Sequence, residues 1–345
     1  MKKAVILIFI LLVTGCDYKE LSDLSIGTVL GIDKQDGKYV VTALVVSENE
    51  GETHLFEGKG ISVVTAINNL NLNLTENLYL NHLQSLVIST EVASEGMKNT
   101  LNYFLKKDDI DKNFYIFLAQ NNTSNEILKH LLEKSNGNYN TITNIFKTHD
   151  EIKFTDNSDT FSTFLDIMLR EGIEPTLNSL SIKDNTLTIS DVGVFKNDKL
   201  VNYIGDNISY ATLIGTAKQI TLSIPCSDST TIVTIENIKI NHKIKNNTVN
   251  NNITGNIRIK ENNCQFETKT EENKQKLKKT ITNKLLKMLD KTINQTRELN
   301  SDIFGYGELF YKNYKNPNIN YPNLKITNKI NFKFKNIESS DTYHE

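Results

Sequence analysis

The side chains of this 345-residue chain that could carry covalent or metal chemistry are three cysteines and six histidines. The histidines are scattered, and none stands at a metal-ligand spacing from another histidine or a cysteine. His82 directly precedes an apolar run, where local hydrogen bonding is a better interpretation than a catalytic base. The sequence contains no nucleophile elbow, glycine-rich phosphate loop, HExxH or CxxC. It therefore predicts a protein that is not an enzyme and that holds neither a metal nor a cofactor.

Cys16 ends an N-terminal segment with the pattern of a signal peptide. Two lysines precede residues 4–13, an apolar run as long as a signal-peptide core and too short to span a bilayer. Residues 13–16 read VTGC, an aliphatic residue, two small residues and a cysteine, which resembles a bacterial lipobox. The alternative is an ordinary secretory signal with an incidental cysteine. The lipobox predicts that residues 1–15 are removed and that the Cys16 thiol carries a diacylglyceryl group. Its two acyl chains, such as palmitate, would anchor the chain durably to a membrane.

Cys226 and Cys264 remain once Cys16 is assigned to the anchor. Both lie in a strand-rich half of the chain, and a compartment outside the cytoplasm permits disulfides. Bridging requires the two Cα atoms to lie within about 7 Å of each other, which spacing along the chain does not specify. A disulfide and two separate buried thiols are therefore both open.

Composition excludes several classes of protein. The 39 Lys and Arg residues against 41 Asp and Glu residues give a net charge of −2, whereas a nucleic-acid-binding protein is normally basic. A hydrophobic share of 38% is sufficient for folded cores and argues against a disordered chain. The length is about twice that of a typical domain, which predicts two or three domains.

Apolar spacing predicts that the first half alternates strands and helices. The expected elements are strands over 25–33 and 39–47 joined by an Asp36-Gly37 turn, a helix over 61–74, a strand over 83–89, a helix from Thr90 to about Lys106, a strand over 113–120, a helix after Thr123 or Ser124, and a helix over 158–171 capped by Ser158. Because the chain opens with a hairpin, the sheet should be mixed rather than wholly parallel.

The second half has more strands. It should contain a hairpin over 186–203, a short helix over 206–214, antiparallel strands between 219 and 266, a helix over 271–297 with Thr268 and Glu271 as a capping box, and a final strand over 324–334. Lysines crowd the outer face of the long helix. That face could attract anionic headgroups or an acidic partner, although a solvated face is the favoured interpretation.

The predicted fold is α+β and multi-domain, with mixed β-sheets flanked by helices and an antiparallel sheet plus long helix in the C-terminal half. The predicted segments are a signal peptide over 1–15, a lipid-anchored linker over 16–24, an N-terminal mixed α/β domain of one or two subdomains over 25–183, and a C-terminal α/β domain over 184–345.

Four stretches of sequence carry a family resemblance. They are residues 16–21 (CDYKEL) with 30–33 (LGID) and 36–39 (DGKY), residues 81–96 (from NHL to EVASEG), residues 194–200 (VFKNDKL), and residues 302–308 (DIFGYGE). Together they resemble the Ger(x)C family of spore germination lipoproteins, the C subunits of nutrient germinant receptors. Family members often carry tryptophan after the lipidated cysteine and again near the C-terminus. This chain has none, and Tyr18 and Tyr314 or Tyr321 stand near those places.

The resemblance implies a non-enzymatic lipoprotein on the outer face of the spore inner membrane. It would act through protein–protein contacts beside two integral-membrane receptor subunits, of the A and B types, and would be needed for germination in response to nutrients. It implies several α/β domains, no nucleic-acid partner and no small-molecule site to carry over. The alternative function is a solute-binding lipoprotein of a transporter, which would require two similar lobes closing on a pocket.

The stretch around residue 305 also has a direct physical interpretation. Gly305 and Gly307 flank Tyr306 and permit a tight backbone path that either exposes or inserts the neighbouring aromatic rings. Core packing is the favoured interpretation. The alternative is an interface patch with a partner, for which the candidate residues are Phe304, Gly305, Tyr306 and Gly307.

Overall fold

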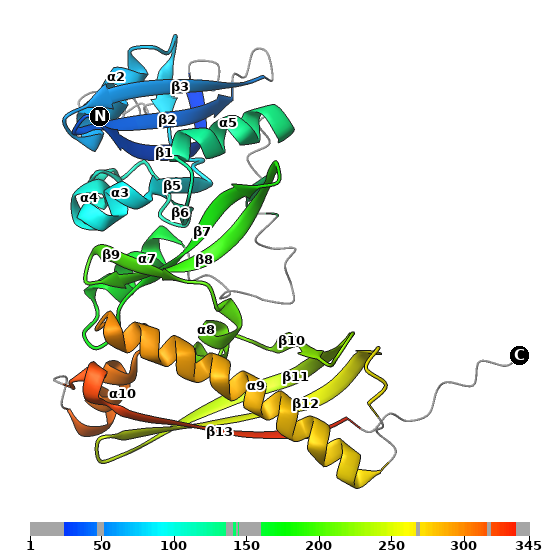
Figure 1. Cartoon of the computed structure of the whole chain (residues 1–345). Coiled ribbons are helices and arrows are strands. Elements are labelled where there is room, and N and C mark those ends of the chain that lie inside the picture. The colour runs from blue at the N-terminus through cyan, green and yellow to red at the C-terminus, as the bar shows by residue number, and fades with distance from the viewer. Residues whose placement is uncertain are drawn as a thin grey trace, which may run out of the picture.

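The structure is a computed structural model that describes residues 24–46, 52–135, 141, 142, 144, 160–266, 270–315 and 319–335. Cys16 and the predicted signal peptide lie outside these residues. Two mixed β-sheets with flanking helices lie one beyond the other along an elongated molecule (Figure 1). This arrangement confirms the predicted α+β class.

The first sheet has the strand order β3-β2-β1-β5-β6-β7-β8-β9, with β4 also paired to β1. Its strands are β1 (Leu24–Gln35), β2 (Lys38–Val46), β3 (Thr53–Gly60), β4 (Asn77–Tyr79), β5 (Ser85–Ser89), β6 (Tyr115–Ala119), β7 (Thr176–Lys183), β8 (Thr186–Lys196) and β9 (Lys199–Ile204). Strands β1, β5, β6 and β7 are parallel, and the hairpins at either end are antiparallel, as a mixed sheet requires. The polar, glycine-containing β3 and the short β4 were not predicted.

The helices of this part are α2 (Val63–Asn71), α3 (Thr90–Glu95), α4 (Met97–Lys106), α5 (Ser124–Ser135) and α7 (Phe161–Leu169). The single helix expected to run from a Thr90 cap to about Lys106 is wrong, because Gly96 adopts a φ of 136° and divides it into α3 and α4. The cap of α3 is Ser89, whose hydroxyl accepts the N–H of Val92. Helix α7 is capped by Thr160, whose hydroxyl accepts the N–H of Thr163. The predicted cap, Ser158, lies outside the described residues.

The second sheet has the order β10-β11-β12-β13. Its elements are α8 (Asn207–Ile214), β10 (Gln219–Pro225), β11 (Thr230–Lys245), β12 (Thr248–Asn262), α9 (Glu271–Glu298), α10 (Tyr306–Tyr314), the short 3₁₀ helix η3 (Tyr321–Asn323) and β13 (Lys325–Phe334). Strands β10, β11 and β12 are antiparallel, as predicted, and the final strand β13, whose pairing the sequence did not specify, runs parallel to β12. The chain returns through α9, and such a crossover brings the next strand back in the same direction.

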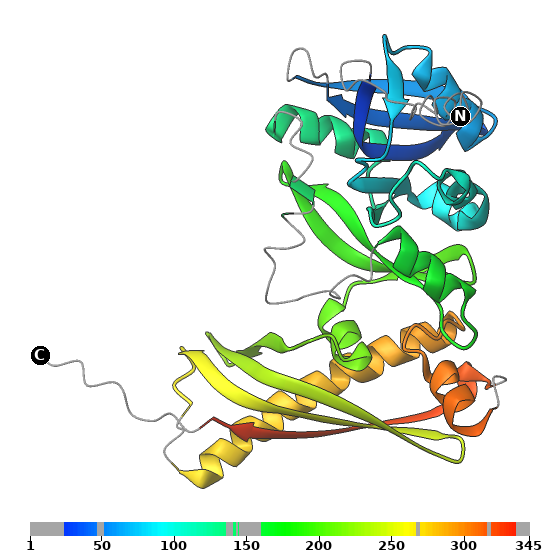
Figure 2. The same cartoon turned by 180° about the vertical axis from the view of Figure 1, so that it is seen from behind.

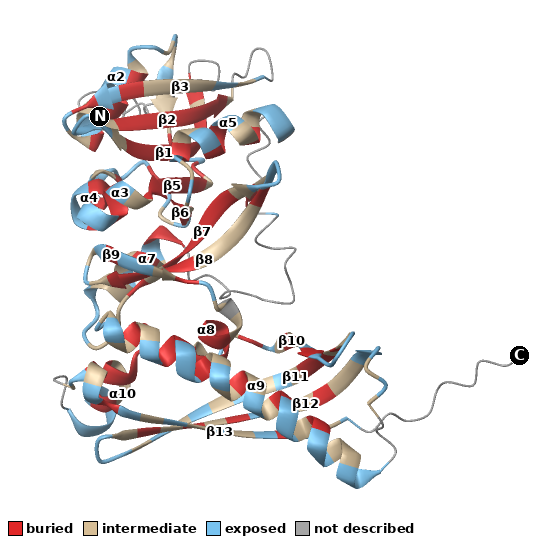
Figure 3. Ribbon diagram, viewed as in Figure 1, coloured by how far each residue is buried: buried red, intermediate tan, exposed pale blue. Residues whose placement is uncertain are grey.

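Helix α9 begins at Glu271, as predicted, but its cap differs. The Thr270 hydroxyl accepts the N–H of Asn273, whereas the predicted cap Thr268 lies outside the described residues. The apolar face of α9 packs on the second sheet and its lysine-rich face points to solvent (Figure 3).

The proposed domain division at residue 183 falls at the turn between β7 and β8, two strands that pair with each other. The hydrogen-bonded ladder of the first sheet continues to Ile204, and the second sheet begins at Gln219. The first sheet thus extends past residue 183, and the two sheets separate after Ile204. The domain division at residue 183 stays a prediction.

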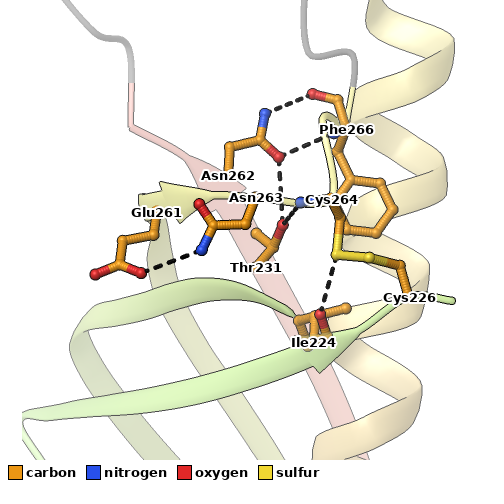
Figure 4. Close-up of a disulfide and its surroundings, with 8 residues drawn as sticks. All are labelled: Ile224, Cys226, Thr231, Glu261, Asn262, Asn263, Cys264 and Phe266. Atoms are coloured by element: carbon orange, nitrogen blue, oxygen red, sulfur yellow. Dashed lines mark hydrogen bonds between the residues drawn. A yellow bond between two sulfur atoms is a disulfide. The ribbon is translucent and has the colours of Figure 1, made fainter. Parts of the chain in front are cut away.

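A disulfide joins Cys226, after β10, to Cys264, after β12, with a Cα–Cα distance of 6.0 Å (Figure 4). The two strands lie on either side of β11, so the bridge passes across the beginning of that strand. The Thr231 hydroxyl accepts the Cys264 N–H at 3.3 Å beneath it. Of the two alternatives that the sequence left open, the structure contains the disulfide.

Candidate functional site at the junction of the two sheets

The DIFGYG stretch lies where the two halves of the molecule meet, against the loop that connects α7 to β7. The Glu174 N–H donates to the Asp302 carbonyl at 3.0 Å, and the Glu308 N–H donates to the Gly172 carbonyl at 2.9 Å. The Ser301 hydroxyl donates to the Phe195 carbonyl of β8 at 2.5 Å. Backbone hydrogen bonds therefore connect a loop of the first half to a loop of the second.

Two glycines make this contact possible. A Cβ on Gly307 would lie 2.8 Å from the Gly172 Cα, and a Cβ on Gly172 would lie 2.5 Å from the Glu308 nitrogen. Gly172 also has a φ of +80°, in the left-handed region that favours glycine. Gly172 follows the helix predicted over 158–171, and no local pattern in the sequence indicates this close approach of two backbones.

The Asp302 side chain holds the backbone of the DIFGYG stretch, which we call the signature, by hydrogen bonds within the stretch. Its buried carboxylate accepts the N–H groups of Gly307 at 2.7 Å and Tyr306 at 3.2 Å, at the start of α10. Burial raises the pKa of Asp302 to about 6, although these N–H donors act in the opposite direction. The nearby Glu174 carboxylate raises it further.

Tyr306 connects the signature to three strands of the second sheet. Its hydroxyl accepts from the Asn251 amide of β12 at 2.8 Å, and that amide also donates to Asn328 of β13 at 2.9 Å. The Asn251 carbonyl oxygen lies 2.7 Å from the His242 ring of β11. Tyr306 and Asn251 are fully buried, and burial raises the pKa of the tyrosine well above its usual range.

All four candidate interface residues are buried. Phe304 and Tyr306 pack against each other with ring centroids 5.6 Å apart, and Gly305 and Gly307 lie in the same interior. Within this chain they pack as the core alternative describes. A contact of these residues with a partner stays a prediction.

A cavity of about 270 Å³ opens beside the signature, lined mainly by apolar side chains that include Ile173 and Phe304. Two carboxylates reach it, and both have partners. Glu174 accepts from Lys196 at 2.7 Å and from the Asn197 N–H at 2.6 Å, while Glu308 lies 3.0 Å from Lys312. The cavity wall is therefore mostly apolar, and its two carboxylates are paired with lysines of the same chain.

Other residues considered for chemistry lie apart from this junction. His82 is exposed in a turn, with its ring 5.9 Å from the ring of Tyr79. Among the described residues, no group of three or more His, Cys, Asp or Glu side chains could hold a metal ion. Within the same residues, no helix combines the length and apolar character needed to cross a membrane.

Family models of known proteins match nearly the whole chain. Residues 17–182 match the family model described as spore germination protein N-terminal domain, and residues 190–338 match the model described as spore germination B3/GerAC like, C-terminal. A solved structure titled "Crystal Structure of the GerBC protein" is similar, with a TM-score of 0.54 and 14% sequence identity, covering 92% of this chain and 100% of that one. At that identity the likeness shows the fold alone. The search of curated proteins found no match.

Proposed function

This chain belongs to the GerAC-like family of spore germination proteins, and we propose that it is the lipid-anchored C subunit of a nutrient germinant receptor. The observation that carries the proposal is the order and extent of the two family matches. The first begins at residue 17, directly after the lipobox cysteine, and the second ends at residue 338. Most of the chain that follows Cys16 therefore matches the family, and what precedes Cys16 has the pattern of a removable signal.

The subunit acts through contacts with other proteins rather than through catalysis. Support comes from the junction, where buried polar groups such as Asp302 and Asn251 are used to hold backbone and side chains together. The partners that we propose are the two integral-membrane receptor subunits of the A and B types. The site of action is the outer face of the spore inner membrane, where the acylated Cys16 would hold the folded body.

Spores that carry Cys16→Ala test the anchor. We expect the protein to leave the membrane fraction and the spores to lose their response to one set of nutrients, although they still form. The matched control is Leu169→Ala, which changes a side chain that is 70% exposed and leaves Cys16 and the disulfide in place. Normal germination by Cys16→Ala spores whose membranes lack the protein would show that anchoring is not required.

Co-purification tests the partners. Membranes from spores that express a tagged chain are solubilised in detergent, and we expect two integral-membrane proteins to copurify in stoichiometric amounts. The same purification from the Cys16→Ala strain is the control, because it removes the tether and keeps the folded body. Recovery of the chain alone from intact membranes would contradict the proposed assembly.

A further inference from the structure

Helix α2 presents an apolar face that the described part of the chain leaves uncovered. Its inner face packs in the first core through Val63, Ala66, Ile67 and Leu70. On the other side Ile61, Val64 and Leu72 are 80%, 47% and 81% exposed. Val64 and Asn68 lie on the outer side of the helix, Leu72 is its C-cap, and Ile61 directly precedes its N-cap, Ser62. Figure 3 shows α2 with much of its outer surface exposed.

The helix is held so that this face cannot turn inward. Gly58 and Gly60 of β3 lie directly under α2, and a Cβ on Gly58 would lie 2.3 Å from the Ala66 carbonyl oxygen. The Asn69 side chain donates to the Lys59 carbonyl at 2.7 Å, and the Asn73 side chain donates to a second β3 carbonyl at 3.0 Å. Because two side chains and a close backbone contact fix its rotation, the outer face is a stable feature of the surface.

The outer face also lacks charge. Residues 61–75 contain no Asp, Glu, Lys or Arg, although such residues make up 23% of the chain. The other exposed positions of the helix are asparagines, Asn68 and Asn69. A helix face that meets water usually carries charged residues, whereas exposed aliphatic side chains among neutral polar ones suit the boundary between headgroups and acyl chains.

The membrane tether enters the fold beside this helix. Leu24, the first described residue, is eight residues beyond Cys16, so an extended tether reaches about 29 Å at most. Leu24 pairs with Asn77 of β4, and the next residue of β4, Leu78, donates its N–H to the Asn71 side chain at the end of α2. The exposed Leu72 follows directly. An acylated Cys16 therefore keeps this end of the molecule near the bilayer.

We infer that the face formed by Ile61, Val64 and Leu72 rests on the lipid bilayer and orients the tethered body. The inference depends on the proposed acylation of Cys16. It places the second sheet and the lysine-rich face of α9 at the end of the molecule away from the lipid, since α2 and the second sheet lie at opposite ends of the fold (Figures 1 and 2). The lysine-rich face of α9 would then meet solvent or a protein.

Site-specific labelling of the full lipidated chain tests this orientation. With Cys16 acylated and Cys226 bonded to Cys264, an added cysteine is the only free thiol in the chain. Leu72→Cys and Ile61→Cys are each labelled with an environment-sensitive fluorophore and reconstituted into phosphatidylcholine vesicles that contain a nitroxide-labelled lipid. Leu169→Cys, a leucine that is 70% exposed on α7, is the matched control.

We expect quenching of the labels at 61 and 72 to exceed that at 169 by about threefold, because only their face enters the headgroup boundary. Adding Ile61→Asn should reduce quenching at 72. Since the face is uncharged, the result should not change with phosphatidylglycerol content or with salt.

Three outcomes would overturn the inference, and each is distinct from failure of the anchor. Equal quenching at 72 and 169 in chains that float with the vesicles would exclude docking while leaving the tether intact. Quenching that requires phosphatidylglycerol and low salt would indicate the lysine-rich face of α9 instead. Shielding of residue 72 only when the integral-membrane subunits are present would indicate a protein partner. If the chain does not float with the vesicles, the proposed acylation itself fails.

Discussion

The two sheets bury their side chains in different ways. In the first sheet, neighbouring residues of one strand enter different cores: Leu30 and Ile32 face α2–α4 and α7, whereas Val29 faces α5. Its central strands are therefore covered on both sides and have nearly continuous apolar sequences. In β12 of the second sheet, Val249, Asn251 and Ile253 are fully buried, whereas Asn250 and Asn252 between them are partly exposed, because α9 covers one face.

This difference is consistent with where the disulfide occurs. A sheet with one covered face buries less apolar area for its size, so it gains more from links that do not depend on burial. The disulfide and the network around Asn251 both belong to the second sheet. The first sheet has buried polar links of its own, such as Asp33 with Ser124 and Ser179 with Gln120, but its described strands carry no disulfide.

The largest expected effect comes from removing the disulfide. Cys226→Ala with Cys264→Ala opens a loop with a sequence separation of 38, which should lower the unfolding free energy by about 4 kcal/mol in the chain-entropy description. Because the bridge lies in the second sheet, hydrogen exchange should accelerate in β10–β12 and stay slow in β1, β5 and β6. Equal acceleration in both sheets would mean that they unfold as one unit, and the comparison would fail.

The next effect concerns the junction between the sheets. The folded-state pKa of Asp302 is raised from 3.8 to about 6, so its protonated form favours folding. This contribution is fully present below about pH 4 and is lost as the pH rises through 6, a change of about 3 kcal/mol. In urea unfolding, the difference between wild type and Asp302→Asn should therefore shrink or reverse by that amount between pH 4 and 7.

Glu174→Gln is the control for this titration, because the Glu174 carboxylate faces Asp302 and raises its pKa. In that variant the loss of stability should still begin near pH 4, where the unfolded-state carboxyl ionises, but it should end at a lower pH and be smaller than in wild type. Parallel stability curves for wild type and Asp302→Asn across the range would show that the carboxyl does not titrate between the folded and unfolded states as its burial requires.

The smallest expected effect is the loss of stability when one tyrosine hydroxyl is removed from each half of the molecule. Tyr306→Phe leaves the buried Asn251 amide with one partner fewer and should cost about 1 kcal/mol in thermal or urea unfolding. Tyr203→Phe removes a hydroxyl that lies 2.6 Å from Thr90 at a half-buried position of the first sheet, and it should cost less. A larger loss for Tyr203→Phe would show that the half-buried hydroxyl of the first sheet contributes more to stability than the buried hydroxyl of the second.

The sequence identified the DIFGYG stretch of the candidate site but not the residues that contact it. The DIFGYG stretch stood out because its glycines and aromatics are close together in the chain, and its core interpretation describes the packing of Phe304 and Tyr306. Its contacts were not readable, because Gly172 is 135 positions before Gly307 and Asn251 is 55 positions before Tyr306. No local pattern distinguishes these residues from ordinary turn and strand residues.

The sequence by itself predicts the lipid anchor at Cys16, which stays a prediction, and it determined the type of most elements, since apolar period and capping residues act over a few positions. Thus the long helix from Glu271 and the Asp36-Gly37 hairpin could be predicted. The tertiary structure alone decided the parallel pairing of β13, the union of Cys226 with Cys264 and the outward face of α2. Each of these depends on which distant segments come together, and that is set by the summed packing of the whole chain rather than by any local stretch.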